Sequence, residues 1–254
     1  MWGGGGQNRG VTSYPIDLST TRFSGLLPPE TVIVEATDPA LWEGGLLPEE
    51  AAFIRQAVPK RQREFTAGRN CARLAMQQLG ITPAPPVRVG AQREPLFPAG
   101  LSGTLTHTHD YCAAAVLRQG TTHSIGIDAE VNDPLGADIA CLVLLPAEQA
   151  MVQAVAVPGL CAGKLVFSIK EAFYKAYFQV AGSYLDFLDA CVSLAPEDGS
   201  FTLQVIRADV PAPFAGTTWR GRYAFDAQRV YSAVAIKAAN KATLKAAVRT
   251  PQSP

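Results

Sequence analysis

The chain has 254 residues, of which 48% are apolar, and its 22 basic side chains balance 22 acidic ones. A zero net charge excludes a general attraction to nucleic acid or anionic membranes, so a charged ligand must be bound by a local cluster. No stretch is apolar for long enough to span a bilayer. Five scattered cysteines without a C-x-x-C pair indicate free, buried thiols in a cytoplasmic protein.

The first half of the chain predicts a mixture of helices and short strands. The glycine-rich residues 1–12 indicate disorder and not a secretion signal. A helix is expected to begin where acidic residues follow a proline, and to end where a helical repeat of apolar residues is followed by glycine. The expected elements are a strand at 31–36, a helix from Pro48, a helix at 59–79, and strands at 104–107 and 113–117.

The second half predicts two helices within a larger set of strands. The expected elements are a strand at 124–130, helices at 146–157 and 160–180, and strands at 190–194, 201–207, 219–225 and 230–237. Helices that come in pairs between strands define an α+β class. No internal sequence repeat is evident, and residues 241–254 are expected to form a tail.

Two carboxylates share one face of the predicted strand in Gly126-Ile127-Asp128-Ala129-Glu130. Asp128 and Glu130 project together because alternate side chains of a strand point to the same side. A hard divalent cation would relieve their repulsion, and Mg²⁺ commonly uses one or two carboxylates plus substrate phosphates. The alternative is a solvated strand end with two acids.

A third carboxylate and two lysines lie in the predicted helix that contains Phe167–Ala176. Glu171 and Lys175 are four residues apart and therefore neighbours on one helix face. An ordinary surface ion pair, worth about 0.2–0.5 kcal/mol, is the alternative interpretation. Together with Lys170, the two segments could hold a metal ion and a polyphosphate at the same site.

Basic residues follow one another along the predicted helix at 59–79. Arg69 and Arg73 share a face, with Arg61 two turns earlier, and such a row can bind a phosphate through paired hydrogen bonds. A solvated helix face is the alternative. His107 and His109 lie on one face of the next strand, where a phosphate donor, a core histidine and a zinc ligand all remain possible.

Four blocks in a fixed order carry a resemblance to a known family. They are Arg61 to Arg73, Arg93 to His107, Gly126 to Glu130 and Phe167 to Ala176. In their order and spacing, from about residue 59 to 180, the chain resembles the Sfp-type 4′-phosphopantetheinyl transferases. It is most similar to the branch that contains the enterobactin synthase component D proteins and actinobacterial enzymes. Phe167 stands where that family often has tryptophan.

The resemblance implies a fold of two similar α+β halves that form a pseudo-dimer within one chain. The halves would span 13–122 and 123–240, flanked by 1–12 and 241–254. The active site would lie between them, as ligand clefts often do. Basic and histidine groups would come from the first half, and the metal site from the second.

The resemblance also implies roles for the conspicuous side chains. Asp128, Glu130 and Glu171 would bind Mg²⁺, for which Mn²⁺ can substitute. The catalytic residues would be Glu171, Lys175 and Asp128, with Glu171 as the base that removes the proton directly or through a metal-bound water. The implied coenzyme A-binding residues are Arg61, Arg69, Arg93, His107, Asp128, Lys170 and Lys175. Among these, Arg61 and Arg69 would hold the 3′-phosphate.

The implied reaction transfers the 4′-phosphopantetheine arm of coenzyme A to a serine of an apo carrier domain and releases 3′,5′-adenosine bisphosphate. Acyl, peptidyl or aryl carrier domains of polyketide, nonribosomal peptide or siderophore synthases would be the partners of a monomeric enzyme that binds no nucleic acid. The alternatives are a metal-dependent phosphohydrolase or nuclease and a non-catalytic coenzyme A-binding module. The former would release inorganic phosphate or cut nucleic acid with no carrier present.

Overall fold

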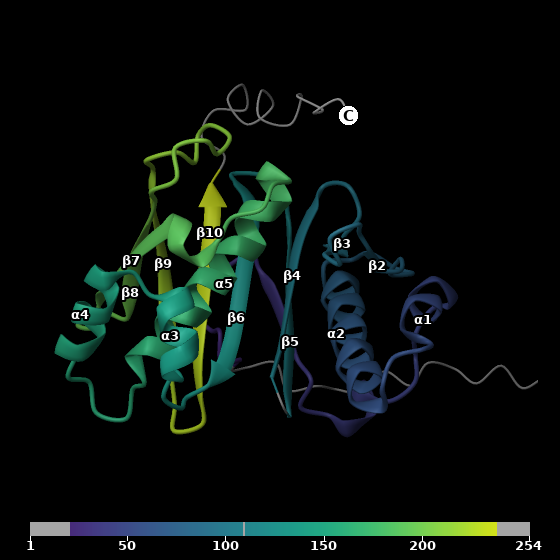
Figure 1. Cartoon of the computed structure of the whole chain (residues 1–254). Helices are drawn as coiled ribbons and strands as arrows, with labels where there is room; N and C mark the ends of the chain where they lie inside the picture. The colour runs from purple at the N-terminus through teal and green to yellow at the C-terminus, as the bar shows by residue number, and fades with distance from the viewer. Residues whose placement is uncertain (1–20, 109, 238–254) are drawn as a thin grey trace, which may run out of the picture.

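A computed structural model describes residues 21–108 and 110–237 of the chain. The expectations for 1–12 and 241–254, and for His109, lie outside the described residues. Antiparallel sheets and packed helices alternate along the chain (Figure 1), which confirms the α+β class. No helix within these two described ranges is both long enough and apolar enough to cross a membrane.

The N-terminal half is a three-stranded antiparallel sheet covered by one long helix. The sheet order is β1 (Val32–Glu35), β5 (Tyr111–Arg118) and β4 (Leu101–Thr108). The covering helix is α2 (Pro59–Gln78), with α1 (Pro48–Ile54) beside it in Figure 1. The small elements are η1 (Pro39–Trp42), β2 (Arg88–Val89) and β3 (Pro95–Leu96). The sequence pattern does not reveal these three, because runs of two to four residues show no periodicity.

The C-terminal half is a five-stranded antiparallel sheet in the order β6-β10-β9-β8-β7. Its strands are β6 (Thr122–Val131), β7 (Ala190–Ala195), β8 (Ser200–Val205), β9 (Thr218–Phe225) and β10 (Arg229–Lys237). Its helices are α3 (Ala137–Val143), α4 (Pro146–Ala154), α5 (Ala162–Ala181) and η2 (Phe187–Asp189). Helix α3 is not among the predicted elements, because it is only seven residues long.

Helix α5 packs on β6 and β10 through the apolar face that the sequence predicts. Val166, Ile169, Phe173, Ala176 and Tyr177 are all buried. Fully burying a large apolar side chain contributes about 1.5–3 kcal/mol, so this face fixes the helix on the sheet. Of the side chains between these positions, Glu171 and Lys175 line a cavity that also contains residues of the N-terminal half, whereas Ser168 bonds to Ser232 of β10 within the C-terminal half.

The two halves meet where β4 runs alongside β6. Side-chain hydroxyls of β4 accept backbone N–H groups of β6, in the pairs Ser102 with Ile125 at 3.0 Å, Thr104 with Ile127 at 3.3 Å and Thr106 with Ala129 at 2.9 Å. The residue numbers increase along both strands from one pair to the next, so β4 and β6 run in the same direction. Every second residue of β4 faces β6, and its side-chain hydroxyl forms the hydrogen bond that a backbone carbonyl would form between the paired strands of a sheet. We call these three pairs the hydroxyl seam.

The cysteines differ in exposure more than the sequence analysis expects. Cys71 and Cys112 are buried, whereas Cys141 is exposed and Cys161 and Cys191 are half-buried. All five are free thiols. The expectation of buried thiols is therefore correct for the pair in the N-terminal core and wrong for Cys141, which lies on the short helix α3.

Candidate active site

Asp128 lies at the end of the hydroxyl seam, where it is 4% exposed. Its Oδ1 accepts hydrogen bonds from Lys175 Nζ at 2.7 Å and from Thr106 Oγ1 at 3.2 Å. Its Oδ2 is buried and has no hydrogen-bond partner in the described part of the chain. A buried carboxylate oxygen without a partner is costly, so this atom fits a ligand that carries positive charge.

Two further carboxylates add negative charge around Asp128. Burial, followed by repulsion from Asp128, raises the pKa of Glu130 to about 7. Burial also raises the pKa of Glu171, and Lys175 opposes that rise. Lys164 and Lys175 oppose the rise at Glu130, but burial and the neighbouring carboxylates outweigh them. Buried carboxylates with raised pKa values suit a site that receives a cation.

The described residues contain no group of three His, Cys, Asp or Glu side chains placed to hold a metal ion together. The expected three-carboxylate centre is therefore not preassembled. Lys175 already contacts Oδ1 of Asp128, and its Nζ also donates to the carbonyl of Ile127 at 3.2 Å. The donor set is nonetheless all oxygen, which suits Mg²⁺, an ion that usually retains waters and substrate phosphates beside one or two carboxylates.

Lys170 lies outside this cluster, and its contact with coenzyme A stays a prediction. Its Nζ donates to Glu148 Oε2 at 2.7 Å, and to the carbonyls of Val143 and Phe187 at 2.8 Å each. An ammonium group has three donors, and all three are used here. The side chain is only 2% exposed, so it is a structural group of the C-terminal core.

Arg61 and His107 come together from α2 and β4. Arg61 Nη1 lies 2.9 Å from His107 Nε2. Arginine only donates, so Nε2 must accept, and His107 is neutral in this contact. The Nδ1 atom lies 3.7 Å from Glu64. Burial is the main cause that lowers the pKa of His107, although Glu64 opposes it.

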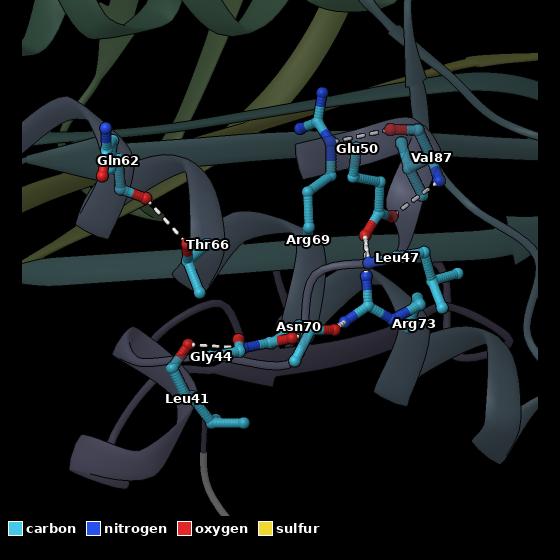
Figure 2. A network of polar contacts seen from close by, with 11 residues as sticks. Leu41, Gly44, Leu47, Glu50, Gln62, Thr66, Arg69, Asn70, Arg73 and Val87 are labelled. Atoms are coloured by element: carbon cyan, nitrogen blue, oxygen red, sulfur yellow. Dashed lines mark hydrogen bonds and ion pairs between the residues drawn. The ribbon is translucent and has the colours of Figure 1, made fainter. Parts of the chain in front are cut away.

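Arg69 is buried on α2, and its Nε donates to the carbonyl of Val87 at 2.8 Å. Its guanidinium lies 4.1 Å from the centre of the Phe65 ring. Burial outweighs the nearby Glu50 and lowers the arginine's pKa to about 10. Arg73, which the sequence places in the same row, instead bonds to Glu50, Asn70 and the carbonyl of Gly45. Figure 2 shows Arg73 inside this polar network.

A cavity of about 580 Å³ opens between the two halves. Glu171, Tyr174 and Lys175 line it from α5, and Phe97 and Leu105 line it from the N-terminal half. Arg93 also lines it, at the one non-glycine position with positive φ (66°) among the described residues. The structure therefore places Arg93 in the same cavity as Glu171 and Lys175.

Two polar residues of this region were missed from the sequence. Gln179 Nε2 donates to the carbonyl of Ile125, and its Oε1 accepts from Ser102. Gln179 follows Glu171 and Lys175 at the same four-residue spacing, so the helical period could have revealed it. Thr106 precedes His107 in the second block, but its contact with Asp128 depends on how two distant strands pair.

The fold thus brings basic and carboxylate side chains to a cavity between two α+β halves, a combination typical of enzymes that act on phosphate groups. Two family models match the chain. One describes the 4′-phosphopantetheinyl transferase N-terminal domain and matches residues 49–117, and the other describes the 4′-phosphopantetheinyl transferase superfamily and matches residues 124–228.

Individual relatives agree with these matches. The chain is 39% identical over 201 residues to 4′-phosphopantetheinyl transferase Svp of Streptomyces mobaraensis, covering 76% of this chain and 79% of the relative. It is 36% identical over 195 residues to 4′-phosphopantetheinyl transferase PptT of Mycobacterium tuberculosis, covering 75% and 86%. Enterobactin synthase component D of Salmonella typhi is 32% identical over 126 residues, 49% of this chain and 51% of the relative. The chain belongs to the 4′-phosphopantetheinyl transferase superfamily, as its sequence blocks predict.

Proposed function

We propose that the cavity between the halves is where the phosphopantetheine arm of coenzyme A passes to a serine of an apo carrier domain of a polyketide, nonribosomal peptide or siderophore synthase. The observation that carries this assignment is Asp128, which is buried at the seam, paired with Lys175 and left with one oxygen that has no partner among the described residues. Cationic and carboxylate groups thus meet beside a cavity of about 580 Å³.

The division into halves at 13–122 and 123–240 supports a site of this kind. Strand β5 ends at Arg118 and β6 begins at Thr122, so the proposed boundary falls one residue into β6, just after the short link between the two sheets. The two family models match on either side of this link. We place the terminal segments 1–12 and 241–254 outside both halves.

Coenzyme A is held, in this proposal, by basic groups from both halves. Arg61 and His107 are already in contact, and Arg69 is a buried cation on the same helix as Arg61. These groups suit the 3′-phosphate and its neighbours, since guanidinium groups bind phosphate through two parallel hydrogen bonds. Lys175 and Arg93 line the cavity, where they would face the pyrophosphate.

Asp128, Glu130 and Glu171 would hold Mg²⁺, and Mn²⁺ can substitute. The unpartnered Oδ2 of Asp128 and the raised pKa values of Glu130 and Glu171 support this donor set. When bound, the ion supplies neutralisation of the charge on the pyrophosphate.

Glu171 would remove the proton from the carrier serine. Its raised pKa brings the carboxylate closer to the range where a general base is effective, a contribution of about 10²–10⁴-fold. The serine Oγ forms a bond to the β-phosphorus of coenzyme A, and the bond to the bridging oxygen breaks. The leaving group is 3′,5′-adenosine bisphosphate, while Lys175 balances the developing negative charge.

Mixing the protein with coenzyme A, Mg²⁺ and an apo acyl carrier protein tests the proposal by intact mass. We expect the carrier to gain one phosphopantetheine arm, and Glu171→Gln and Asp128→Ala each to lower the rate by about 10²-fold or more. Glu197→Gln, in the exposed turn between β7 and β8, is the control. Inorganic phosphate released without carrier would support a phosphohydrolase instead. Binding of coenzyme A without transfer to any of a panel of carriers would support a binding module.

A further inference from the structure

The two short helices α1 and α4 begin in the same way. The segment before and into α1 reads Leu46-Leu47-Pro48-Glu49-Glu50, and the segment into α4 reads Leu144-Leu145-Pro146-Ala147-Glu148. The third helical residue is a glutamate in both, and it reaches back to the chain before the helix. Glu50 Oε2 accepts from Leu47 N at 3.0 Å, and Glu148 Oε2 accepts from Leu145 N at 2.8 Å.

The other oxygen of each glutamate binds a backbone group that follows the long helix of its half. Glu50 Oε1 accepts from Val87 N at 2.9 Å, directly before β2. Glu148 Oε1 accepts from Val192 N at 2.7 Å, within β7. Each carboxylate therefore ties the start of a short helix to a segment about forty residues further on.

Each glutamate also binds a cation from the long helix itself. Arg73 of α2 pairs with Glu50, and Lys170 of α5 pairs with Glu148. Both glutamates are 1% exposed. The same three partners thus recur in the two halves: a helix start, a later backbone N–H and a cation. The sequence analysis found no repeat because this one preserves only Leu-Leu-Pro-x-Glu.

We propose that Glu50 and Glu148 are equivalent positioning residues, one in each half, and that each fixes the long helix that carries a different part of the site. Neither glutamate is placed among the groups that bind coenzyme A or the reacting atoms. Their effects therefore pass through α2 and α5. This inference rests on the proposed function and assigns separate tasks to the two halves.

In the N-terminal half, the link runs from Glu50 through Val87 to Arg69. Val87 donates its N–H to Glu50 and accepts from Arg69 Nε with its carbonyl, at 2.9 and 2.8 Å. Figure 2 shows a dashed line from Val87 to Arg69 and another from Val87 to Glu50. A change at Glu50 thus moves the partner that orients the buried guanidinium, and the expected consequence is weaker binding of coenzyme A.

In the C-terminal half, the link runs from Glu148 through Lys170 to Glu171, the next residue of α5. Lys170 holds the carbonyls of Val143 and Phe187 as well as Glu148, so it anchors this turn of the helix from three sides. Lys175 lies one turn further on. A change at Glu148 thus displaces the proposed base and its neighbour, and the expected consequence is slower transfer.

Glu50→Gln and Glu148→Gln test this division because glutamine keeps the shape but presents an NH₂ donor where an acceptor is needed. We expect Glu50→Gln to raise the KM for coenzyme A about tenfold with kcat little changed. We expect Glu148→Gln to lower kcat by about 10- to 100-fold with that KM little changed, since a shift of about 1 Å can cost 10²-fold. Glu49→Gln, beside Glu50 but exposed, is the matched control.

Calorimetric titration with coenzyme A alone separates this inference from the proposed function. If the wild-type chain binds coenzyme A but transfers nothing, the proposed function fails, and Glu50→Gln must still weaken binding relative to Glu148→Gln. Equal changes in kcat and KM for both variants would overturn the inference, as would lowered melting temperatures with unchanged kinetics. If Glu148→Gln does not fold, Lys170→Arg is tested in its place. This variant gives Glu148 an arginine partner, as Glu50 has in Arg73. It must lower kcat and not raise the KM for coenzyme A.

Discussion

Gly126 on β6 lies directly beneath α5, the helix that carries Glu171 and Lys175. A Cβ atom at this position would lie 1.8 Å from the carbonyl oxygen of Ala172 and 2.9 Å from the amide nitrogen of Ala176. Both are backbone atoms of a helix packed on a sheet, and they cannot rotate away as a side chain can. We predict that Gly126→Ala separates α5 from β6.

The size of the displacement follows from these contacts. Real Cβ atoms almost never approach another heavy atom within 3.0 Å, so the helix backbone must move by more than 1 Å at Ala172. Overpacking of this kind costs about 1–3 kcal/mol and occasionally more. A displacement of about 1 Å at a catalytic group can lower the rate by 10²-fold. We therefore expect a loss of transfer that is larger than the loss of stability suggests.

Chemical denaturation and the carrier-transfer assay measure the two effects on the same preparation. Gly163→Ala is the matched control, because its Cβ would meet Leu135 and Val152 only at 3.5 and 3.7 Å. Alanine also favours the helix over glycine by about 1 kcal/mol, so this variant should be as stable as the wild type or more so. Near-normal transfer by folded Gly126→Ala would refute the claim that contact between α5 and β6 sets the site.

Two further predictions concern Asp128 and Glu130. Thr106→Val and Thr104→Val each remove one hydroxyl of the seam without changing its shape, but only Thr106 also bonds Asp128. The melting temperature should fall in both variants, but kcat should fall by about tenfold or more only in Thr106→Val. The same kcat in the two variants would contradict this. The folded pKa of Glu130, about 7, exceeds its ordinary 4.5, so its contribution to stability is complete below about pH 4.5 and lost as pH rises through 7. Solvent screening limits this contribution to the free energy of unfolding to about 1–2 kcal/mol. The rise in melting temperature caused by Mg²⁺ should increase with pH across the same window in the wild type and not in Glu130→Gln.

The sequence predicts most of the regular structure because its periodicities are strong. The predicted apolar face of α5 is buried as expected, from Val166 to Tyr177. The predicted strand at 124–130 is extended by a few residues in β6, at Thr122–Val131. Long, periodic segments carry their own signal. Helix α3 carries none, since seven residues give too few turns for an apolar stripe.

The site was less predictable because spacing along a helix does not tell which neighbour a side chain meets. Lys170 and Lys175 both belong to the predicted cluster, yet Lys170 turns to Glu148 and only Lys175 reaches Asp128. Arg69 and Arg73 share a predicted face, yet Arg73 pairs with Glu50. In each case the partner is a buried glutamate more than twenty residues away in the sequence. Glu50 binds Arg73, and Glu148 binds Lys170.

The hydroxyl seam also determines where the proposed catalytic groups can lie. Strands β4 and β6 do not pair through backbone hydrogen bonds in the seam, because the hydroxyl groups of β4 lie between the two backbones. Each hydrogen bond of the seam therefore uses a side chain of the N-terminal half. The last rung, Thr106, accepts the N–H of Ala129 and donates to Asp128. Asp128 is therefore oriented from one half by Thr106 and from the other by Lys175. Because the carboxylate has partners in both halves, neither half alone can preserve its geometry, and the interface between them is itself part of the proposed active site.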